Sequence, residues 1–317
     1  MARMTASEPS SATLDVRGAL REAIHSLREA NVPSHTLAAE LLLMHALGRD
    51  RAWLYAHPEE ALDAKQAARC FELVERRAAG VPTQYLTGKQ EFWGLEFEVT
   101  PAVLIPRPET EHVVEVALER LGQNRTRDPL RIADVGTGSG CIAIALAHEM
   151  PAAHIIATDI SAPALEVARR NATRLGVSDR IDFIECSLLE AFVGAQHLSR
   201  AQSRDAAPLQ PVHAPFDLIV SNPPYVGRAE EHLLPRDVRE HEPAQALFAG
   251  ESGFEVYAPL VRQARELLRP GGLLVLELGY NSLERVDALV SAASAWIHVS
   301  VTQDLAGIPR VLAAERA

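Results

Sequence analysis

The chain has 317 residues, of which 47% are hydrophobic, so it is longer than one typical domain and can bury a sizeable core. Its 42 acidic and 31 basic residues give a net charge of −11, which argues against wide contact with a nucleic-acid backbone and favours a protein or small-molecule substrate. The three cysteines are widely spaced and the histidines form no cluster, so neither a disulfide framework nor a metal site is expected.

The first part of the chain is expected to be helical after a short tail. Residues 1–13 are rich in Ser, Ala and Thr and lack an apolar core, which predicts a flexible tail, with an organellar transit peptide as the alternative. Within residues 14–80, apolar residues recur at helical spacing, with Ser34 as a candidate N-cap and Gly48 and Gly80 as candidate helix ends. No apolar run approaches the roughly 18 residues of a membrane-spanning helix, so we expect no membrane contact.

A change of pattern follows at residues 81–104. Apolar and polar residues alternate between Gln90 and Val99, which predicts a β-hairpin linking two domains. The prolines of Ile105–Glu111 predict an extended approach to a helix that begins near Thr110. From residue 105 to residue 317, strand-like and helix-like segments alternate, as in a doubly wound sheet.

The glycine-rich segment Gly136-Thr137-Gly138-Ser139-Gly140 lies between a predicted strand, Leu130–Val135, and an apolar helix. The next predicted strand, His154–Asp159, ends in a carboxylate that could receive the two hydroxyls of a ribose. This layout is typical of nucleoside binding. A dinucleotide requires G-x-G-x-x-G, whereas this chain has G-x-G-x-G after Asp134, which disfavours a pyrophosphate and favours the ammonium and sulfonium of S-adenosylmethionine.

Two segments with different patterns come next. Ile181–Ile184 is a predicted strand, and the stretch from Gly194 to Pro215 has no apolar period, as expected of a loop that is functional or disordered.

The buried strand predicted at Phe216–Val220 ends abruptly at Asn222-Pro223-Pro224-Tyr225. Neither proline donates an N–H, and both fix φ, so the turn is rigid. The side-chain carbonyl of Asn222 and the backbone carbonyl of Pro223 could accept both N–H groups of an amide or amino group, packed against Tyr225. This arrangement suits methyl transfer to nitrogen, although the same residues are also ordinary turn formers.

The remaining segments complete a doubly wound pattern. A helix at Tyr257–Leu268 and a buried strand at Leu273–Leu278 are followed by two strands, Trp296–Val301 and Val311–Ala314, that flank residues 304–310.

Five motifs together resemble the bacterial release-factor glutamine methyltransferases of the HemK/PrmC type, over about residues 14 to 316. They are Ile105-Pro106-Arg107-Pro108-Glu109-Thr110-Glu111, the glycine turn, Asn222-Pro223-Pro224-Tyr225, Glu242-Pro243, and Asp304-Leu305-Ala306-Gly307 with Arg310. The resemblance implies an N-terminal helical domain (14–80) that engages the release factor. It also implies a seven-stranded methyltransferase domain (105–317) with a Rossmann-like fold and a reversed last hairpin.

The resemblance further implies the activity and the site. The expected reaction is transfer of a methyl group from S-adenosyl-L-methionine to the amide nitrogen of the glutamine in the Gly-Gly-Gln motif of class 1 release factors, in the cytoplasm, by a monomer. The catalytic residues are then Asn222, Pro223 and Tyr225, with Pro224 also at the substrate. The cofactor would contact Gly136, Thr137, Gly138, Ser139, Gly140, Asp159, Ser187, Leu188 and Asn222.

One segment departs from the family. Ser187 and Leu188 stand where family members commonly have an acidic and an aromatic residue against the adenine.

Three alternatives stay open from the sequence. A glutamine methyltransferase of a ribosomal protein is disfavoured by Pro106-Arg107-Pro108-Glu109. An adenine-N6 nucleic-acid methyltransferase is disfavoured by the net charge and the lack of a basic recognition domain. A non-catalytic protein that binds S-adenosylmethionine or a dinucleotide is disfavoured by the intact Asn222 and Tyr225.

Overall fold

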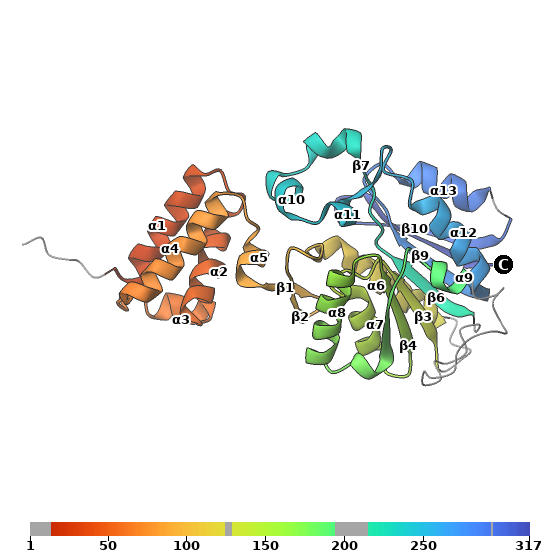
Figure 1. Cartoon of the computed structure of the whole chain (residues 1–317), viewed down its shortest axis with the longest axis horizontal. Coiled ribbons are helices and arrows are strands. Elements are labelled where there is room, and N and C mark those ends of the chain that lie inside the picture. Colours follow the sequence, from red (N-terminus) through yellow and green to blue (C-terminus); the bar gives the residue numbers. More distant parts are fainter. Residues whose placement is uncertain (1–13, 124–128, 194–214, 293) are drawn as a thin grey trace, which may run out of the picture. The chain divides into compact units, whose positions relative to one another are not determined.

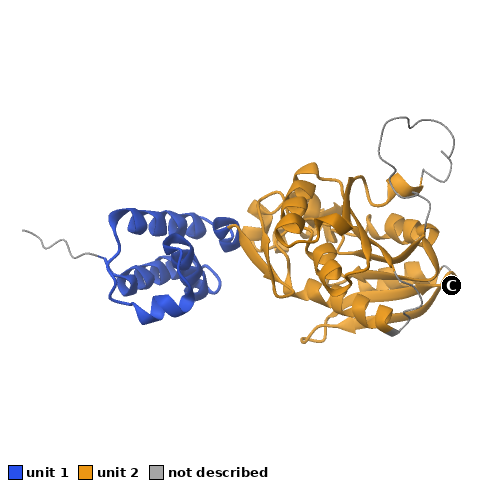
Figure 2. Cartoon of the chain, turned by 90° about the horizontal axis from the view of Figure 1, so that it is seen from below, with its two compact units in different colours: residues 1–87 blue, residues 88–317 orange. Residues whose placement is uncertain are grey.

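The computed structural model describes residues 14–123, 129–193, 215–292 and 294–317. The predicted flexible tail (1–13) and nearly all of the Gly194–Pro215 stretch lie outside these residues. The chain divides into two compact units, Met1–Thr87 and Gly88–Ala317, which are coloured separately in Figure 2.

Unit 1 is helical, as the spacing of its apolar residues predicted. Its helices are α1 (Val16–Glu29), α2 (His35–Leu47), α3 (Arg51–Ala56), α4 (Ala64–Ala78) and α5 (Thr83–Thr87). Helices α1, α2 and α4 bury one shared apolar core that includes Leu27, Leu42 and Leu73. Gly48 ends α2 in the left-handed conformation, as expected. Ser34 precedes α2 but makes no capping hydrogen bond, because its φ of 49° is far from the extended geometry that lets an N-cap side chain reach the helix.

Unit 2 begins with the predicted hairpin and continues into an α/β domain (Figure 1). The hairpin strands pair antiparallel. The strands of unit 2 are β1 (Lys89–Phe92), β2 (Leu95–Glu98), β3 (Arg131–Val135), β4 (His154–Asp159), β5 (Ile181–Glu185), β6 (Phe216–Ser221), β7 (Val226–Gly227), β8 (Phe248–Gly250), β9 (Leu268–Glu277), β10 (Trp296–Gln303) and β11 (Pro309–Arg316). Its helices are η1 (Pro108–Thr110), α6 (Glu111–Gln123), α7 (Cys141–Glu149), α8 (Ala162–Arg174), η2 (Ser178–Arg180), α9 (Glu190–Val193), η4 (Arg228–Leu233), α10 (Arg236–His241), α11 (Ala244–Leu247), α12 (Tyr257–Leu267) and α13 (Leu283–Ser291).

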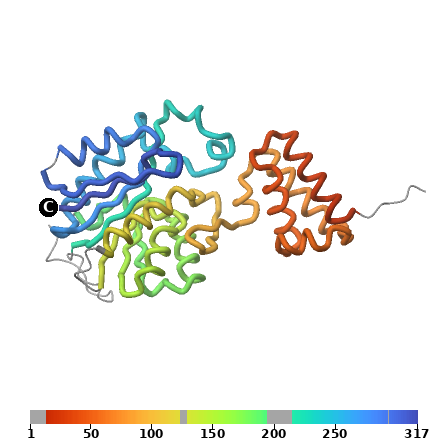
Figure 3. The backbone as a smooth tube through the Cα atoms, turned by 180° about the vertical axis from the view of Figure 1, so that it is seen from behind, coloured from red at the N-terminus to blue at the C-terminus, as the bar shows by residue number. Residues whose placement is uncertain are grey.

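The main sheet has seven strands in the order β10-β11-β9-β6-β3-β4-β5. Strands β9, β6, β3, β4 and β5 are parallel, whereas β11 runs antiparallel to β9 and to β10. The last two strands form a hairpin at one edge of the sheet, which can be followed in Figure 3. The predicted fold class, a seven-stranded doubly wound sheet after a small all-α region, is therefore confirmed.

Helices cover both faces of this sheet, so its central strands are apolar on both sides. Along β9, Leu273 and Val275 pack toward α6 and α7, and Leu274 and Leu276 pack toward α12 and α13. This alternation with period two fixes the register of each strand. Because the central strands are parallel, their carboxyl ends meet at one edge, where the loops that follow β3, β4 and β6 gather.

No helix among the described residues is long and apolar enough to cross a lipid bilayer.

Candidate active site

A cavity of about 430 Å³ opens at the carboxyl edge of the sheet. Residues from the ends of β3, β4, β5 and β6 line it, together with Ala102 to Leu104 and residues from α11, β8 and the start of α12. A crevice outside the carboxyl ends of parallel strands is the usual ligand site of such sheets. Across the described parts of the chain, no three His, Cys, Asp or Glu side chains are grouped so as to hold a metal ion.

The glycine turn forms one wall of the cavity through its backbone. Gly136 and Gly138 line the cavity with φ values of 75° and 56°, and a Cβ at either position would meet no atom within 4 Å. The turn therefore leaves a cradle that only glycine can form without strain. The side chains of Thr137 and Ser139 are buried. At Gly140 a Cβ would come within 3.2 Å of Ala168, so this glycine serves the packing of α7 on α8.

Asp134, expected to act on the ligand through its charge, lies beneath the turn. It is fully buried and is not among the residues that line the cavity. Its Oδ2 accepts from Thr137 Oγ1 at 2.7 Å and from the backbone N–H of Ala143 at 3.1 Å. Burial raises the pKa of Asp134 to about 7, and these two hydrogen bonds oppose that rise. Asp134 thus ties the glycine turn to the first turn of α7.

Asp159 ends β4 and faces the cavity. Its Oδ2 accepts from the N–H of Gly138 at 2.9 Å, and its Oδ1 accepts from the N–H of Ser161 at 2.9 Å. Burial raises the pKa of Asp159, and the backbone N–H groups of Ser161 and Gly138 lower it. Each carboxylate oxygen has a second acceptor position, so the side chain can still receive two hydroxyl groups.

Ser187 and Leu188 line the cavity beside Cys186. Leu188 has a φ of 50°, which is strained for a leucine. Its carbonyl accepts from Thr158 Oγ1 at 2.8 Å, and the following N–H, of Leu189, donates to Gln263 at 2.9 Å. These two contacts hold the strained backbone of Leu188 beside the cavity.

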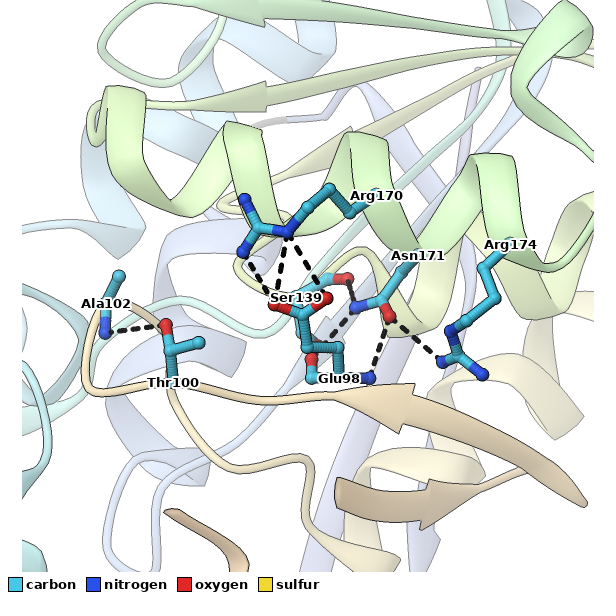
Figure 4. Close-up of polar contacts among 7 residues, drawn as sticks. All are labelled: Glu98, Thr100, Ala102, Ser139, Arg170, Asn171 and Arg174. Atoms are coloured by element: carbon cyan, nitrogen blue, oxygen red, sulfur yellow. Dashed lines mark hydrogen bonds and ion pairs between the residues drawn. The ribbon is translucent and has the colours of Figure 1, made fainter. Parts of the chain in front are cut away.

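Asn171 joins the glycine turn to the hairpin (Figure 4). This fully buried residue of α8 donates from Nδ2 to the carbonyl oxygens of Ser139 and Glu98, both at 3.0 Å, and accepts from the N–H of Glu98 at 2.7 Å. Arg170 adds an ion pair to the Glu98 carboxylate at 2.7 Å. The end of β2 is thereby fixed to the turn, which places the cavity-lining residues 102–104 that follow it.

The turn after β6 separates two cavities. Ser221 Oγ donates to the carbonyl of Val135 at 2.7 Å, which holds the end of β6 beside the glycine turn. Asn222, Pro223 and Pro224 line the large cavity, whereas Asn222, Pro223 and Tyr225 line a second one of about 180 Å³. Asn222 and Pro223 are therefore common to the linings of both cavities, together with Leu104 and Ala246.

An ion pair joins Glu242, between α10 and α11, to Arg107 in the segment before η1. Arg107 donates to Glu242 Oε1 at 2.6 Å, and Glu242 Oε2 accepts from the N–H of Ile105 at 3.2 Å. Glu242 is almost fully buried, which raises its pKa, and Arg107 opposes that rise. The Pro-Arg-Pro segment and Glu242-Pro243, recognised separately in the sequence, thus form one contact.

Sequence reasoning missed several residues of the site. Phe248 and Gln245 line the large cavity, and Thr110 accepts from Asn222 Nδ2 at 3.1 Å. Phe248 and Gln245 carry no positional signal in the sequence, whereas Thr110 belongs to the family motif of residues 105–111 and is predicted there as a possible helix start.

Two family models match the chain: a PrmC N-terminal domain over residues 18–88 and a methyltransferase domain over residues 127–306. The release factor glutamine methyltransferase of Bradyrhizobium diazoefficiens is 41% identical over 301 residues, covering 95% of both chains. That of Moorella thermoacetica is 44% identical, covering 96% of this chain and 99% of the relative. The solved hMettl16 catalytic domain has a TM-score of 0.52 at 18% identity, covering 77% of this chain and 82% of its own, and is similar in fold.

Proposed function

The chain belongs to the family of release factor glutamine methyltransferases, and on this premise we propose that it methylates the glutamine of the Gly-Gly-Gln loop of class 1 release factors. The predicted family, and with it a methyltransferase that uses S-adenosylmethionine, is confirmed. The relatives support neither the ribosomal-protein substrate nor the adenine substrate.

The residues of the large cavity fit S-adenosylmethionine. The cradle at Gly136 and Gly138 accepts a ligand close to the backbone, and Asp159 has free acceptor positions for the ribose hydroxyls. Leu188 and Ser187 would cover one side of the adenine. When bound, the cofactor supplies an electrophilic methyl group on a sulfonium.

The amide nitrogen of glutamine is a poor nucleophile because its lone pair is delocalised. Asn222 Oδ1 and the Pro223 carbonyl oxygen accept its two N–H bonds in our proposal, so they orient the nitrogen and stabilise positive charge that develops on it. The N–CH₃ bond would form as the bond between the methyl group and the sulfonium sulfur breaks, and the nitrogen would release one proton to solvent. Positioning of this kind can contribute roughly 7–11 kcal/mol to lowering a barrier.

Tyr225 packs against the amide and does not act as a base. Burial raises its pKa, so the phenol stays neutral. Its ring lies close to Gly279, where a Cβ would come within 2.8 Å of the ring. That contact holds the ring in place beside the small cavity.

A single observation carries the proposal: Asn222 and Pro223 are walls of both cavities. The large cavity takes the cofactor and the small one takes the glutamine side chain, so that the acceptor groups stand where methyl donor and nitrogen meet.

We also propose that the protein acts in the cytoplasm and as a monomer. Its substrate in this proposal is the release factor and not a nucleic acid. The net charge of −11 supports a substrate other than nucleic acid.

The test is to incubate the protein with radiolabelled S-adenosylmethionine and an unmethylated class 1 release factor. A copy of the factor in which the last residue of Gly-Gly-Gln is alanine serves as the matched control. We expect label in the first and none in the second. Label in both would place the reaction on another residue, and label in neither would contradict the proposed substrate.

A further inference from the structure

Two buried side chains that the proposed mechanism does not use lie behind Asn222. Thr110 ends η1 and Glu277 ends β9, and each is 2% exposed. Ser221 pairs with Leu276 across the parallel strands β6 and β9, so Asn222 and Glu277 each follow a paired residue. The sheet register therefore brings the carboxylate of Glu277 close to the catalytic turn.

Hydrogen bonds link these three side chains in a row. Asn222 Nδ2 donates to Thr110 Oγ1 at 3.1 Å, and hydrogen bonding by the Thr110 side chain lowers the pKa of Glu277, the next buried group. The second oxygen of Glu277, Oε2, is buried without a hydrogen-bond partner. The row starts at the active site and ends in the core beneath the sheet edge.

Which group donates in each hydrogen bond of the row follows from the protons that the side chains carry. An ionised carboxylate only accepts, and a threonine hydroxyl has one proton. That proton goes to Glu277, so Thr110 Oγ1 can only accept from Asn222. The two ends of an asparagine amide have almost the same shape, and only their partners distinguish them. With Nδ2 bound to Thr110, Oδ1 is the end that remains for the substrate.

We propose that Thr110 and Glu277 are positioning residues that set the orientation of the Asn222 amide, so that its acceptor end faces the substrate nitrogen. The proposal rests on the proposed function, since an acceptor is needed only if the substrate is an N–H donor. A reversed amide would present Nδ2 to the substrate N–H groups, donor against donor, and would leave the charge on the nitrogen without stabilisation.

The protonation state of Glu277 determines whether the Asn222 amide keeps this orientation. Burial raises the pKa of Glu277 to about 7, and the hydrogen bond from Thr110 lowers it. A protonated Glu277 could donate to Thr110, whose own proton could then go to Asn222 Oδ1, and the orientation would no longer be fixed. The charged and titratable groups that interact electrostatically with Glu277 are Arg107, Glu109, Cys141, Tyr225, Tyr257 and Arg310.

The activity test compares Thr110→Val, which has nearly the same shape and no hydroxyl, with Thr110→Ser, which keeps the hydroxyl. We expect kcat to fall about tenfold in the valine variant, with the cofactor Kd unchanged, and to be restored in the serine variant. Glu277→Gln can donate to Thr110 as a protonated Glu277 can, so its kcat should be below that of the wild type at pH 8 and should not decline further below about pH 7. An unchanged kcat in Thr110→Val, or an equal loss in the valine and serine variants, would overturn the proposal.

A second measurement needs no substrate. The side-chain NH₂ signal of Asn222, assigned by its loss in Asn222→Asp, should exchange slowly with solvent in the wild type and in Thr110→Ser, and faster in Thr110→Val. Equal exchange in all three would also overturn the proposal. A wild-type protein that leaves the release factor unlabelled contradicts the proposed function instead, because the exchange measurement still determines the amide orientation.

Discussion

The two sides of the active site are held in place by different kinds of contact. On the cofactor wall (Gly136–Gly140 and Asp159), the carboxylates of Asp134 and Asp159 accept from backbone N–H groups at most 21 residues away in the chain, and the side chains of Thr137 and Asn171 each add one hydrogen bond. On the acceptor wall (Asn222–Tyr225 with Thr110 and Glu277), side chains hold side chains, and Thr110 is 112 residues from Asn222. Backbone donors survive any substitution of their own residue except by proline, whereas a row of side chains fails when one member is replaced. We therefore expect the acceptor wall to be the more sensitive to single substitutions. Substitutions there should lower kcat more than they lower cofactor affinity.

The largest effect expected from breaking the acceptor wall is that of Asn222→Ala. Removing one preorganised group that stabilises transition-state charge lowers kcat by about 10²–10³-fold. Since the cradle and Asp159 are untouched, cofactor affinity should stay close to that of the wild type. Turnover at saturating cofactor, with calorimetric binding as the control, checks both expectations. Turnover near the wild-type rate would rule out the amide clamp.

The buried carboxylate of the acceptor wall should also affect stability. With a pKa raised from 4.5 to about 7, Glu277 binds a proton more tightly in the folded than in the unfolded chain. The free-energy cost of burying its ionised carboxylate is therefore absent below about pH 4.5 and fully present above about pH 7. The free energy of unfolding accordingly falls as pH rises through that window. The cost is about 3 kcal/mol. Denaturant unfolding at pH 5 and pH 8 should show a smaller drop for Glu277→Gln than for the wild type. The drop that remains comes in part from Asp134, whose pKa is raised in the same direction. An identical drop in both proteins would place the charge cost elsewhere.

Asp159→Ala probes the cofactor wall, where binding rather than rate should respond. Losing charge-assisted hydrogen bonds weakens cofactor binding by about 10–100-fold. Asp159→Asn keeps one acceptor oxygen and should lie between the alanine variant and the wild type. Calorimetry measures all three, and kcat at saturating cofactor should change little. A dissociation constant that does not move in Asp159→Ala would remove Asp159 from the cofactor site.

The same contrast explains what could be predicted from the sequence. The glycine turn, Asp159 and the alternating strands are local patterns, and a turn between a strand and a helix at a sheet edge allows few arrangements. The rigid Asn222-Pro223-Pro224-Tyr225 turn predicted the acceptor groups from its own residues, and the family resemblance added the identity of the substrate. Thr110, Glu277 and the contact between Arg107 and Glu242 could not be found in this way, because each joins residues that are distant in the chain.

Asp134 shows the opposite error. Its place before the glycine turn indicated a residue that acts on the ligand, but the backbone directs its carboxylate away from the cavity and toward the N–H of Ala143. Whether a side chain at a strand end faces the ligand or the helix depends on the pleat, and one residue of register reverses it.

The smallest effect expected, and the sharpest control, comes from a pair of glycines. Gly138 on the cofactor wall and Gly48 at the end of α2 have φ values of 56° and 62°, and a Cβ at either would meet no atom within 4 Å. Alanine should therefore cost each unit about 1 kcal/mol through backbone strain alone. Only at Gly138 would the added methyl group enter the cavity, so Gly138→Ala should weaken cofactor binding and Gly48→Ala should not. Because the backbone strain is the same in both variants, any difference in cofactor affinity comes from the methyl group that Gly138→Ala places in the cavity. Equal affinities in the two variants would mean that the ligand does not approach the backbone at this turn.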